Sequence, residues 1–245
     1  MSQNPVAIVT GAANNIGLAC ATRFAQGGYT VVMADIADAS EQAAKLPNAV
    51  AARVDVSNME SCLAAVELAR SLGPLTTLVH CAGITKPACS ILEMPVEEWE
   101  QVVRVNLTGT FLLAKACIPA MLGVEGASMV LFSSRAAKTG FAALGSNGSK
   151  TKAHYCASKA GAISLVKSLA MELAEQGVRV NGVAPGPVEG TMIPQSQWES
   201  IASRVPLHRL GKPTDMAEAA WFLASPQAGF ITGHILDVNG GTLMD

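Results

Sequence analysis

The chain is poor in aromatic and charged residues, and its charges form no clusters. Phe, Trp and Tyr make up 4% of the 245 residues, and Asp, Glu, Lys and Arg make up 15%. The formal net charge is −2, from 17 basic and 19 acidic residues, and we find neither a basic cluster nor an acidic tail. This balance does not favour nucleic acid or an anionic membrane surface as a partner.

Signals for metal binding, export and membrane insertion are also missing. The six cysteines include no CxxC pair and share no metal-ligand spacing with the four histidines, so we expect no metal site and reduced cysteines. The first basic residue is Arg23, and the apolar stretch at 219–236 is broken by Pro226, Gly229 and His234. We therefore expect a cytoplasmic protein without a membrane span.

The sequence does contain a regular alternation of short apolar runs and longer helical patterns. Apolar, β-branched runs predict seven strands, at 6–9, 30–33, 50–54, 75–79, 129–132, 178–183 and 235–238. Helical spacing predicts helices at 16–26, 57–72 with Ser57 as cap, 97–122 with a split near Gly109, 153–176 and 213–224. This alternation favours one α/β domain over residues 1–245, with parallel strands joined by right-handed crossovers.

Two long loops interrupt this alternation, at residues 135–152 and at about 185–206. Both follow predicted strands at their carboxyl ends, which is where open α/β sheets bind ligands. Long irregular loops in a compact domain are uncommon and often functional. We expect the second loop to close over the substrate.

Residues suited to a dinucleotide follow the first two predicted strands. Gly11 permits a tight turn into a helix whose free N–H groups can hold a pyrophosphate, and Gly17 allows that helix to pack closely on the strand. Any sharp turn from a strand to a helix can contain two such glycines, so the pair alone does not define a nucleotide site. Asp35, 24 residues beyond Gly11, can accept hydrogen bonds from a ribose 2′-hydroxyl; the alternative is a helix cap. Asp55 is equally suited to an adenine contact or a cap.

The cofactor preference follows from the few basic residues in this region. Between Asn14 and Met33 the only lysine or arginine is Arg23, well inside the predicted helix. A 2′-phosphate would therefore meet the Asp35 carboxylate and no evident cation. The sequence favours NAD over NADP.

A second group of residues suits proton transfer. Tyr155 and Lys159 share one face of a predicted helix, where the lysine charge can lower the pKa of the phenol. Ser134 ends the predicted strand at 129–132, so its hydroxyl lies at the carboxyl edge of the sheet. The spacing YxxxK alone is common by chance and does not define a site.

Taken together, these motifs and several others resemble the short-chain dehydrogenase/reductase family. In order they are Thr10-Gly11…Ile16-Gly17, Ala82-Gly83, Asn106, Ser134, Tyr155…Lys159, Pro185-Gly186 and Ile231-Thr232-Gly233…Val238-Asn239-Gly240-Gly241. The resemblance runs from about residue 5 to residue 241. It implies a single-domain Rossmann fold: a doubly wound seven-stranded parallel sheet in the order 3-2-1-4-5-6-7 with helices on both faces.

The resemblance also implies roles for individual residues. Tyr155 would exchange a proton with the substrate oxygen, and Ser134 would hydrogen-bond that oxygen. Lys159 would lower the pKa of Tyr155 and hold the nicotinamide ribose. Asn106 would hold a relay water at a helix distortion. Hydride passes directly between cofactor and substrate, so no metal is required. The residues implied to bind NAD are Gly11, Asn14, Asn15, Ile16, Asp35, Asp55, Val56, Cys81, Ala82, Gly83, Tyr155, Lys159, Pro185, Gly186, Val188 and Thr191.

Three departures from the family pattern qualify these roles. Asn15 replaces a glycine and must tolerate a turn, which asparagine manages best if its φ is positive. His80 and Cys81 replace two asparagines, whose side-chain contacts are lost or replaced. Ser134 and Tyr155 are 21 residues apart, more than the family's usual interval, so Ser146 and Ser149 are alternatives for the catalytic hydroxyl. We prefer Ser134 because a strand end is rigid; the extra residues, 142–152, would shape the substrate pocket or cover a subunit edge.

Three functions fit this sequence. The first is an NAD-dependent oxidoreductase that interconverts a secondary alcohol and a carbonyl compound, with a small-molecule substrate. The alternatives are a 3-oxoacyl thioester reductase using NADPH, against which Asp35 counts, and a catalytically silent nucleotide-sensing protein. The resemblance suggests a homotetramer. No motif identifies the substrate, but Met94, Phe141, Met192 and Trp198 favour a neutral or weakly polar one.

Overall fold

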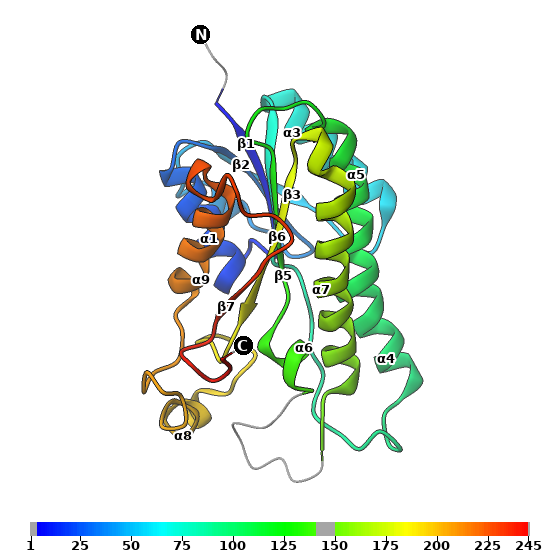
Figure 1. Cartoon of the computed structure of the whole chain (residues 1–245), viewed down its shortest axis with the longest axis vertical. Helices are drawn as coiled ribbons and strands as arrows, with labels where there is room; N and C mark the ends of the chain where they lie inside the picture. The colour runs from blue at the N-terminus through cyan, green and yellow to red at the C-terminus, as the bar shows by residue number, and fades with distance from the viewer. Residues whose placement is uncertain (1–3, 141–149, 245) are drawn as a thin grey trace.

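Seven parallel strands form one sheet in the computed structural model, which describes residues 4–140 and 150–244 (Figure 1). The strands are β1 (Val6–Thr10), β2 (Thr30–Asp35), β3 (Ala49–Arg53), β4 (Leu75–His80), β5 (Ser128–Phe132), β6 (Arg179–Pro185) and β7 (Ile235–Val238). They lie in the order β3-β2-β1-β4-β5-β6-β7. The predicted fold class and strand order are confirmed, and each predicted strand lies within two residues of an observed one.

Helices separate the strands along the chain. The α-helices are α1 (Asn15–Gln26), α2 (Ser40–Ala43), α3 (Met59–Leu72), α4 (Val96–Val103), α5 (Gly109–Met121), α6 (Arg135–Thr139), α7 (Ala153–Leu173), α8 (Trp198–Ala202) and α9 (Pro213–Ala224). A π-helix, η1 (Arg104–Thr108), joins α4 to α5. Short 3₁₀ turns follow at η2 (Ala174–Gln176), η3 (Gln195–Gln197) and η4 (Pro226–Ala228).

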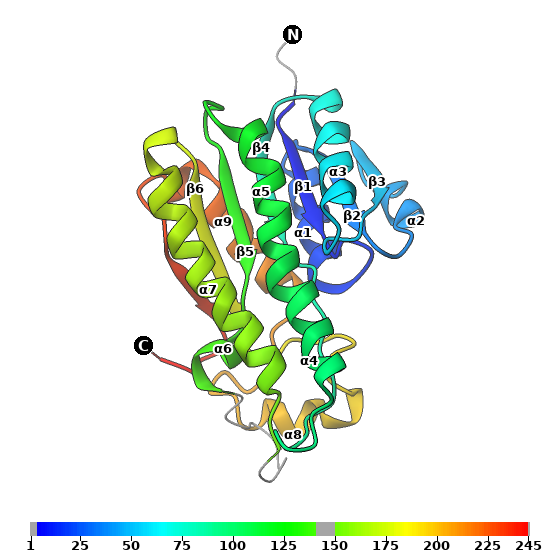
Figure 2. The same ribbon diagram turned by 90° about the vertical axis from the view of Figure 1, so that its right-hand side faces the viewer.

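The helices cover both faces of the sheet, which explains why its strands are almost uniformly apolar. Helices α1 and α9 lie on one face, and α3, α5 and α7 lie on the other (Figures 1 and 2). Along β1, Val6 and Ile8 belong to the core under α3, α5 and α7, whereas Ala7 and Val9 belong to the core under α1 and α9. Since every β1 side chain is buried, period-two alternation of polar residues is absent.

Where the structure differs from the sequence prediction, the elements are short or the boundary is set by a cap. Helices α2, α6 and α8 were not predicted, because four or five residues are too few to show helical periodicity. The cap of α3 is Asn58, whose side chain accepts a hydrogen bond from Ser61 N at 2.9 Å, and not Ser57. The predicted split near Gly109 corresponds to η1, which ends one residue earlier.

The run Val96–Met121, formed by α4, η1 and α5, has the length and hydropathy of a membrane-spanning helix. Its inner residues, among them Leu113, Ala114 and Cys117, are buried in the core beneath α3 and α7. In this fold the run is therefore a core helix with one outward face.

All seven strands point the same way, so their carboxyl ends meet at one edge of the sheet, at the lower end in Figure 1. Helices α6 and α8 lie at this edge, together with the loops after β4 and β6 (Figures 1 and 2). The parallel sheet thereby gathers segments that are far apart in the sequence.

Gly17 provides a test of the close packing at the start of α1. A β-carbon at this position would lie 2.0 Å from the carbonyl oxygen of Gly11, which belongs to rigid backbone. We expect Gly17→Ala to lower the free energy of unfolding by about 3 kcal/mol, the upper part of the range for overpacked sites. Urea denaturation measures this change. The control is Gly211→Ala, whose β-carbon would meet the mobile end of Met216 at 3.2 Å; equal losses in both variants would contradict the packing role of Gly17.

Candidate active site

Two turns at the carboxyl edge of the sheet are held together by the Thr10 hydroxyl. Its oxygen accepts hydrogen bonds from Cys81 N and Ala82 N, both at 3.1 Å. Gly11 has φ +65°, and a β-carbon there would lie 3.1 Å from Ala82 N. The turn after β1 and the turn after β4 are thus in direct backbone contact, which leaves no room for a side chain at Gly11.

The next residues form the beginning of α1, where a pyrophosphate would meet free N–H groups. Asn14 is extended, with φ −156°, and Asn15 has φ +52°. The prediction that Asn15 replaces glycine by adopting a positive φ is confirmed. Its amide lies over Gly190 in the loop after β6, since a β-carbon on Gly190 would be 1.9 Å from Asn15 Nδ2. Ile16, half-buried, follows in the first turn of the helix.

The Asp35 carboxylate lies beside this turn at the end of β2. Its two oxygens accept hydrogen bonds from Ala13 N and Ala37 N, both at 2.9 Å. The bond to Ala37 forms a local turn and caps no helix, since the N-cap of α2 is Ala39, whereas the bond to Ala13 reaches the turn after β1. Arg23 lies elsewhere: it forms an ion pair with Glu218 at 2.8 Å. The nearest cation in the sheet is Arg53, the register partner of Asp35 on β3.

Asp55 does not cap α3, since Asn58 does, and it forms a local turn just before that helix. Its carboxylate accepts hydrogen bonds from the backbone N and the hydroxyl of Ser57, at 2.9 and 2.7 Å. The adjacent Val56 is buried, and its side chain packs directly against Gly109 at the start of α5. A β-carbon on Gly109 would lie 2.9 Å from Val56 Cγ2, so this glycine lets α5 approach the turn after β3.

Asn106 occupies the centre of the π-helix and is fully buried. Its amide pairs with the backbone of Ile84, accepting from Ile84 N at 2.8 Å and donating to Ile84 O at 2.9 Å. The same amide donates to the Ser158 hydroxyl at 3.1 Å. Asn106 therefore ties the loop after β4 to helix α7. The predicted helix distortion at this residue is observed, and π-helical turns occur frequently at functional sites.

Lys159 is buried on α7, and its ammonium donates to the carbonyl oxygen of Phe132 at the end of β5, at 2.8 Å. A β-carbon on Gly83 would lie 3.2 Å from both Lys159 Nζ and Asn106 Oδ1. The lysine, the asparagine and the turn after β4 thus converge on one point. Burial lowers the pKa of Lys159 to about 8.

Tyr155 lies one helical turn before Lys159 and is half-buried. Its phenol interacts with the nearby Ser134 side chain, whose hydroxyl oxygen accepts a hydrogen bond from Ala136 N at 3.1 Å and so caps α6. Burial raises the pKa of Tyr155, and the interaction with Ser134 opposes that rise. The effect of the Lys159 charge on this phenol stays a prediction.

The alternative serines, Ser146 and Ser149, and the proposed pocket residue Phe141 lie outside the described residues. Among the described residues, Ser134 is the serine whose side chain influences the pKa of the Tyr155 phenol.

The loop after β6 starts at the same edge. Gly186 N donates to Val238 O at 2.9 Å, and a β-carbon on Gly186 would lie 2.7 Å from the Asn239 backbone, so Pro185-Gly186 must pass close to β7. Val188 pairs with Gly211 in an isolated parallel bridge. Thr191 is exposed.

Sequence reasoning did not foresee how His80 and Cys81 replace the family's asparagines. His80 is buried, and its Nδ1 lies 2.9 Å from the Thr10 hydroxyl. Burial lowers the pKa of His80 to about 3, so the ring is neutral. Since Thr10 already accepts two N–H bonds, its proton points to His80 Nδ1. The Cys81 thiol contacts Cys20 on α1, with 3.9 Å between the sulfur atoms.

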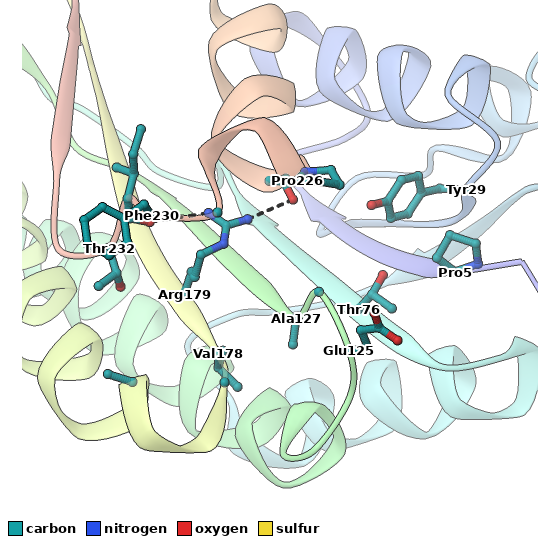
Figure 3. Close-up of a pocket in the computed structure, with 16 residues that line it drawn as sticks. Pro5, Tyr29, Thr76, Glu125, Ala127, Val178, Arg179, Pro226, Phe230 and Thr232 are labelled. Carbon is teal, nitrogen blue, oxygen red and sulfur yellow. Dashed lines mark hydrogen bonds between the residues drawn. The ribbon is translucent and has the colours of Figure 1, made fainter.

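A separate hollow lies at the opposite, amino end of the strands (Figure 3). Its central side chain is Arg179, whose guanidinium donates to the carbonyl oxygens of Leu223, Ala224, Ser225 and Ile231. Arg179 thus satisfies the last carbonyls of α9, and this hollow is a structural junction. In the described part of the chain, no three His, Cys, Asp or Glu side chains group as a metal site would require.

Comparison with known proteins agrees with this arrangement. The sequence pattern of the family described as enoyl-(acyl carrier protein) reductase matches residues 11–242. A 3-oxoacyl-[acyl-carrier-protein] reductase of Thermotoga maritima is 35% identical over 99% of each chain. A cis-4-hydroxycyclohexanecarboxylate dehydrogenase of Sinomonas cyclohexanicum is 36% identical over 96% of this chain and 95% of its own.

Among solved structures, a 3-ketoacyl-(acyl-carrier-protein) reductase of Brucella melitensis, complexed with NADH, superimposes with a TM-score of 0.88. It is 34% identical and covers 98% of each chain. The chain belongs to the short-chain dehydrogenase/reductase family. It is an enzyme that uses a nicotinamide cofactor to interconvert alcohols and carbonyl compounds. The glycine turn, the start of α1 and the Asp35 carboxylate fit such a cofactor.

The low pKa of Lys159 predicts a pH-dependent stability. Because the folded pKa is about 8 and the ordinary value 10.5, the unfolded chain binds the extra proton between these values, and stability rises with pH there. Lys159→Met removes the cost of burying the charge. We expect the variant without cofactor to be about 2 kcal/mol more stable than the parent at pH 7, after subtraction of the lost hydrogen bond to Phe132. This difference in stability should shrink between pH 8 and pH 10.5.

Urea denaturation across this pH range measures the effect. Lys167→Met, an exposed lysine on the same helix, is the control and should change stability little at any pH. A constant difference between parent and Lys159→Met from pH 7 to pH 10.5 would show that Lys159 is not buried as a cation.

Proposed function

We propose that the protein is an NAD-dependent oxidoreductase acting on a small secondary alcohol or the corresponding ketone, with Tyr155 as its general acid and base. The observation that carries this proposal is the grouping of Tyr155, one helical turn before the buried Lys159, with the Ser134 side chain at the start of α6. Asn106 completes the group, because it fixes the loop after β4 against α7.

In the oxidation direction, the Tyr155 phenolate accepts the hydroxyl proton of the alcohol. The Ser134 hydroxyl donates a hydrogen bond to the same oxygen while the carbonyl forms. A bound nicotinamide cofactor, held at the turn after β1 and by Asp35, would supply the acceptor for the hydride that leaves the substrate carbon. The alcohol thereby loses one hydride and one proton, and the proton remains on Tyr155 until it passes to solvent. The Lys159 charge, held by Phe132, favours the phenolate once the phenol ionises.

The alternatives are supported to different degrees. A 3-oxoacyl thioester reductase remains the second candidate, because the reductases of Thermotoga maritima and Brucella melitensis share about a third of their residues with this chain. The two named reductases and the named dehydrogenase count against a catalytically silent protein. Family membership also supports a homotetramer and a cytoplasmic location as parts of the proposal. Exposed apolar side chains on the outer faces of the helices, such as Val96, Phe111 and Met171, suit a subunit contact.

The preference for NAD is proposed from Asp35. Its carboxylate is fixed by Ala13 N and Ala37 N at the position where the second ribose would lie, and a 2′-phosphate there would be repelled. Arg53, exposed on the neighbouring strand, is the residue best placed to attract a phosphate instead. The Brucella melitensis reductase structure is described as a complex with NADH, which supports the preference for NAD.

Titration with NADH and NADPH, followed by nicotinamide fluorescence, tests this preference. We expect the parent to bind NADH at least tenfold more tightly than NADPH, because a 2′-phosphate near Asp35 costs about 1.4 kcal/mol or more. Asp35→Ala should abolish the preference, whereas Arg53→Ala should leave it unchanged. Tighter NADPH binding by the parent, lost in Arg53→Ala, would overturn the NAD assignment and favour the thioester reductase.

Tyr155→Phe tests the catalytic assignment. Loss of a general acid or base slows catalysis by about 10²- to 10⁴-fold, so we expect kcat/KM to fall by that factor for any alcohol that the parent oxidises. NADH affinity should change little. The matched control is Tyr29→Phe, the other tyrosine of the chain, which packs against Phe24 away from the site. Comparable activity of parent and Tyr155→Phe would show that Tyr155 does not transfer the proton.

A further inference from the structure

The segment that carries the two proposed catalytic hydroxyls is basic, although the whole chain has a net charge of −2 and its sequence predicted no basic cluster. From Ser134 to Lys159 the sequence contains no aspartate or glutamate, and its cations are Arg135, Lys138, Lys150, Lys152 and Lys159. Lys159 belongs to the proton-transfer group, and Lys138 forms an ion pair with Asp237. Arg135 and Lys152 are adjacent to that group, and the proposed mechanism uses neither charge.

Lys152 is held in a fixed position at the entrance to α7. The residue before it, Thr151, forms an antiparallel bridge with Cys89, with N–O distances of 3.0 and 3.1 Å. The Lys152 ammonium donates to the Thr85 hydroxyl at 3.2 Å. Thr85 follows Ile84, the residue that Asn106 holds. Lys152 therefore bridges the loop after β4 and the first turn of α7, one helical turn before Tyr155.

The second cation, Arg135, belongs to the neighbouring helix α6. It is the first residue of α6 and directly follows Ser134. Both Arg135 and Lys152 are half-buried, and burial lowers the pKa of both side chains. Arg135 directly follows Ser134 and Lys152 lies three residues before Tyr155, so the two cations flank the pair of proposed catalytic hydroxyls. Charges shielded from solvent attract an anion more strongly than exposed ones do.

We propose that Lys152 and Arg135 form a carboxylate subsite beside the catalytic hydroxyls, and that the substrate is a hydroxy acid or its oxo acid. This inference rests on the proposed function. The subsite lies within one helical turn of Tyr155, so the carboxylate and the reacting carbon belong to the same small molecule. The thioester group of a 3-oxoacyl substrate carries no charge and has no use for two cations here. The inference also departs from the neutral substrate that the sequence favoured.

Binding to the protein saturated with NADH tests the subsite without turnover, because an alcohol cannot react with the reduced cofactor. The probes are 3-hydroxybutanoate and 4-hydroxycyclohexanecarboxylate, each compared with its neutral amide by isothermal titration calorimetry. We expect each acid to bind at least tenfold more tightly than its amide. Lys152→Met should weaken the acids by about 10- to 100-fold, the range for a hydrogen bond to a charged group, and the amides less than twofold.

Three control variants make this result specific. Lys150→Met, an exposed lysine two residues away, removes the same charge and should change neither affinity. Arg135→Met should reproduce the effect of Lys152→Met, and Lys152→Arg should retain the preference for acids. Equal binding of acids and amides by the parent, or an equal loss of both in Lys152→Met, would overturn the subsite.

The same proteins separate this inference from the proposed function. If NADH binds and neutral secondary alcohols reduce NAD as efficiently as the acids do, only the carboxylate subsite fails. If NADH does not bind, the proposed function fails, but titration of the protein alone with acids and amides still tests the subsite. A preference for acids that Lys152→Met abolishes would support the subsite. Equal binding of acids and amides would overturn it.

Discussion

The burial of the Lys159 ammonium is the constraint on which the rest of the site depends. A charge in the protein interior needs a hydrogen-bond acceptor, and the carbonyl oxygen of Phe132 supplies one because it ends β5 beneath α7. The Ser133 hydroxyl donates to the Lys159 carbonyl at 2.8 Å and so attaches α7 to the same strand end. Gly83 leaves space for the ammonium, and Asn106 borders it. Four segments of the chain are therefore positioned around one cation.

Much of this fold could be predicted from sequence because the strands are buried on both faces. An apolar run such as Val6–Thr10, which is entirely buried, predicts a strand even when the helices that cover it are unknown. The pairing of Tyr155 with Lys159 was equally accessible, since helix geometry alone fixes residues four apart on one face. The short helix α6 was not, because a five-residue helix begins where Ser134 caps it and has no periodicity of its own.

Other features depend on contacts that no sequence pattern contains. The direction of the Tyr155 pKa shift follows from its burial and from Ser134, and residue spacing specifies neither. The choice between cap and cofactor contact at Asp35 was open in the sequence, and the structure shows why: the carboxylate bonds both to its own turn and to Ala13 across the sheet. The bridge between Cys89 and Thr151, which fixes Lys152, joins segments 62 residues apart.

The replacement of two asparagines by His80 and Cys81 shows how such a network can tolerate a change of residue type. The Thr10 hydroxyl accepts from the backbone of Cys81 and Ala82, so the turn after β4 is held by main-chain atoms and not by the replaced side chains. His80 must then accept the remaining Thr10 proton, which a protonated ring could not do. Its neutrality, enforced by burial beside Lys159, is therefore a condition for the turn that lies against Gly11. Because a second positive charge here would also oppose the Lys159 ammonium, the same burial serves the cofactor turn and the proton-transfer group together.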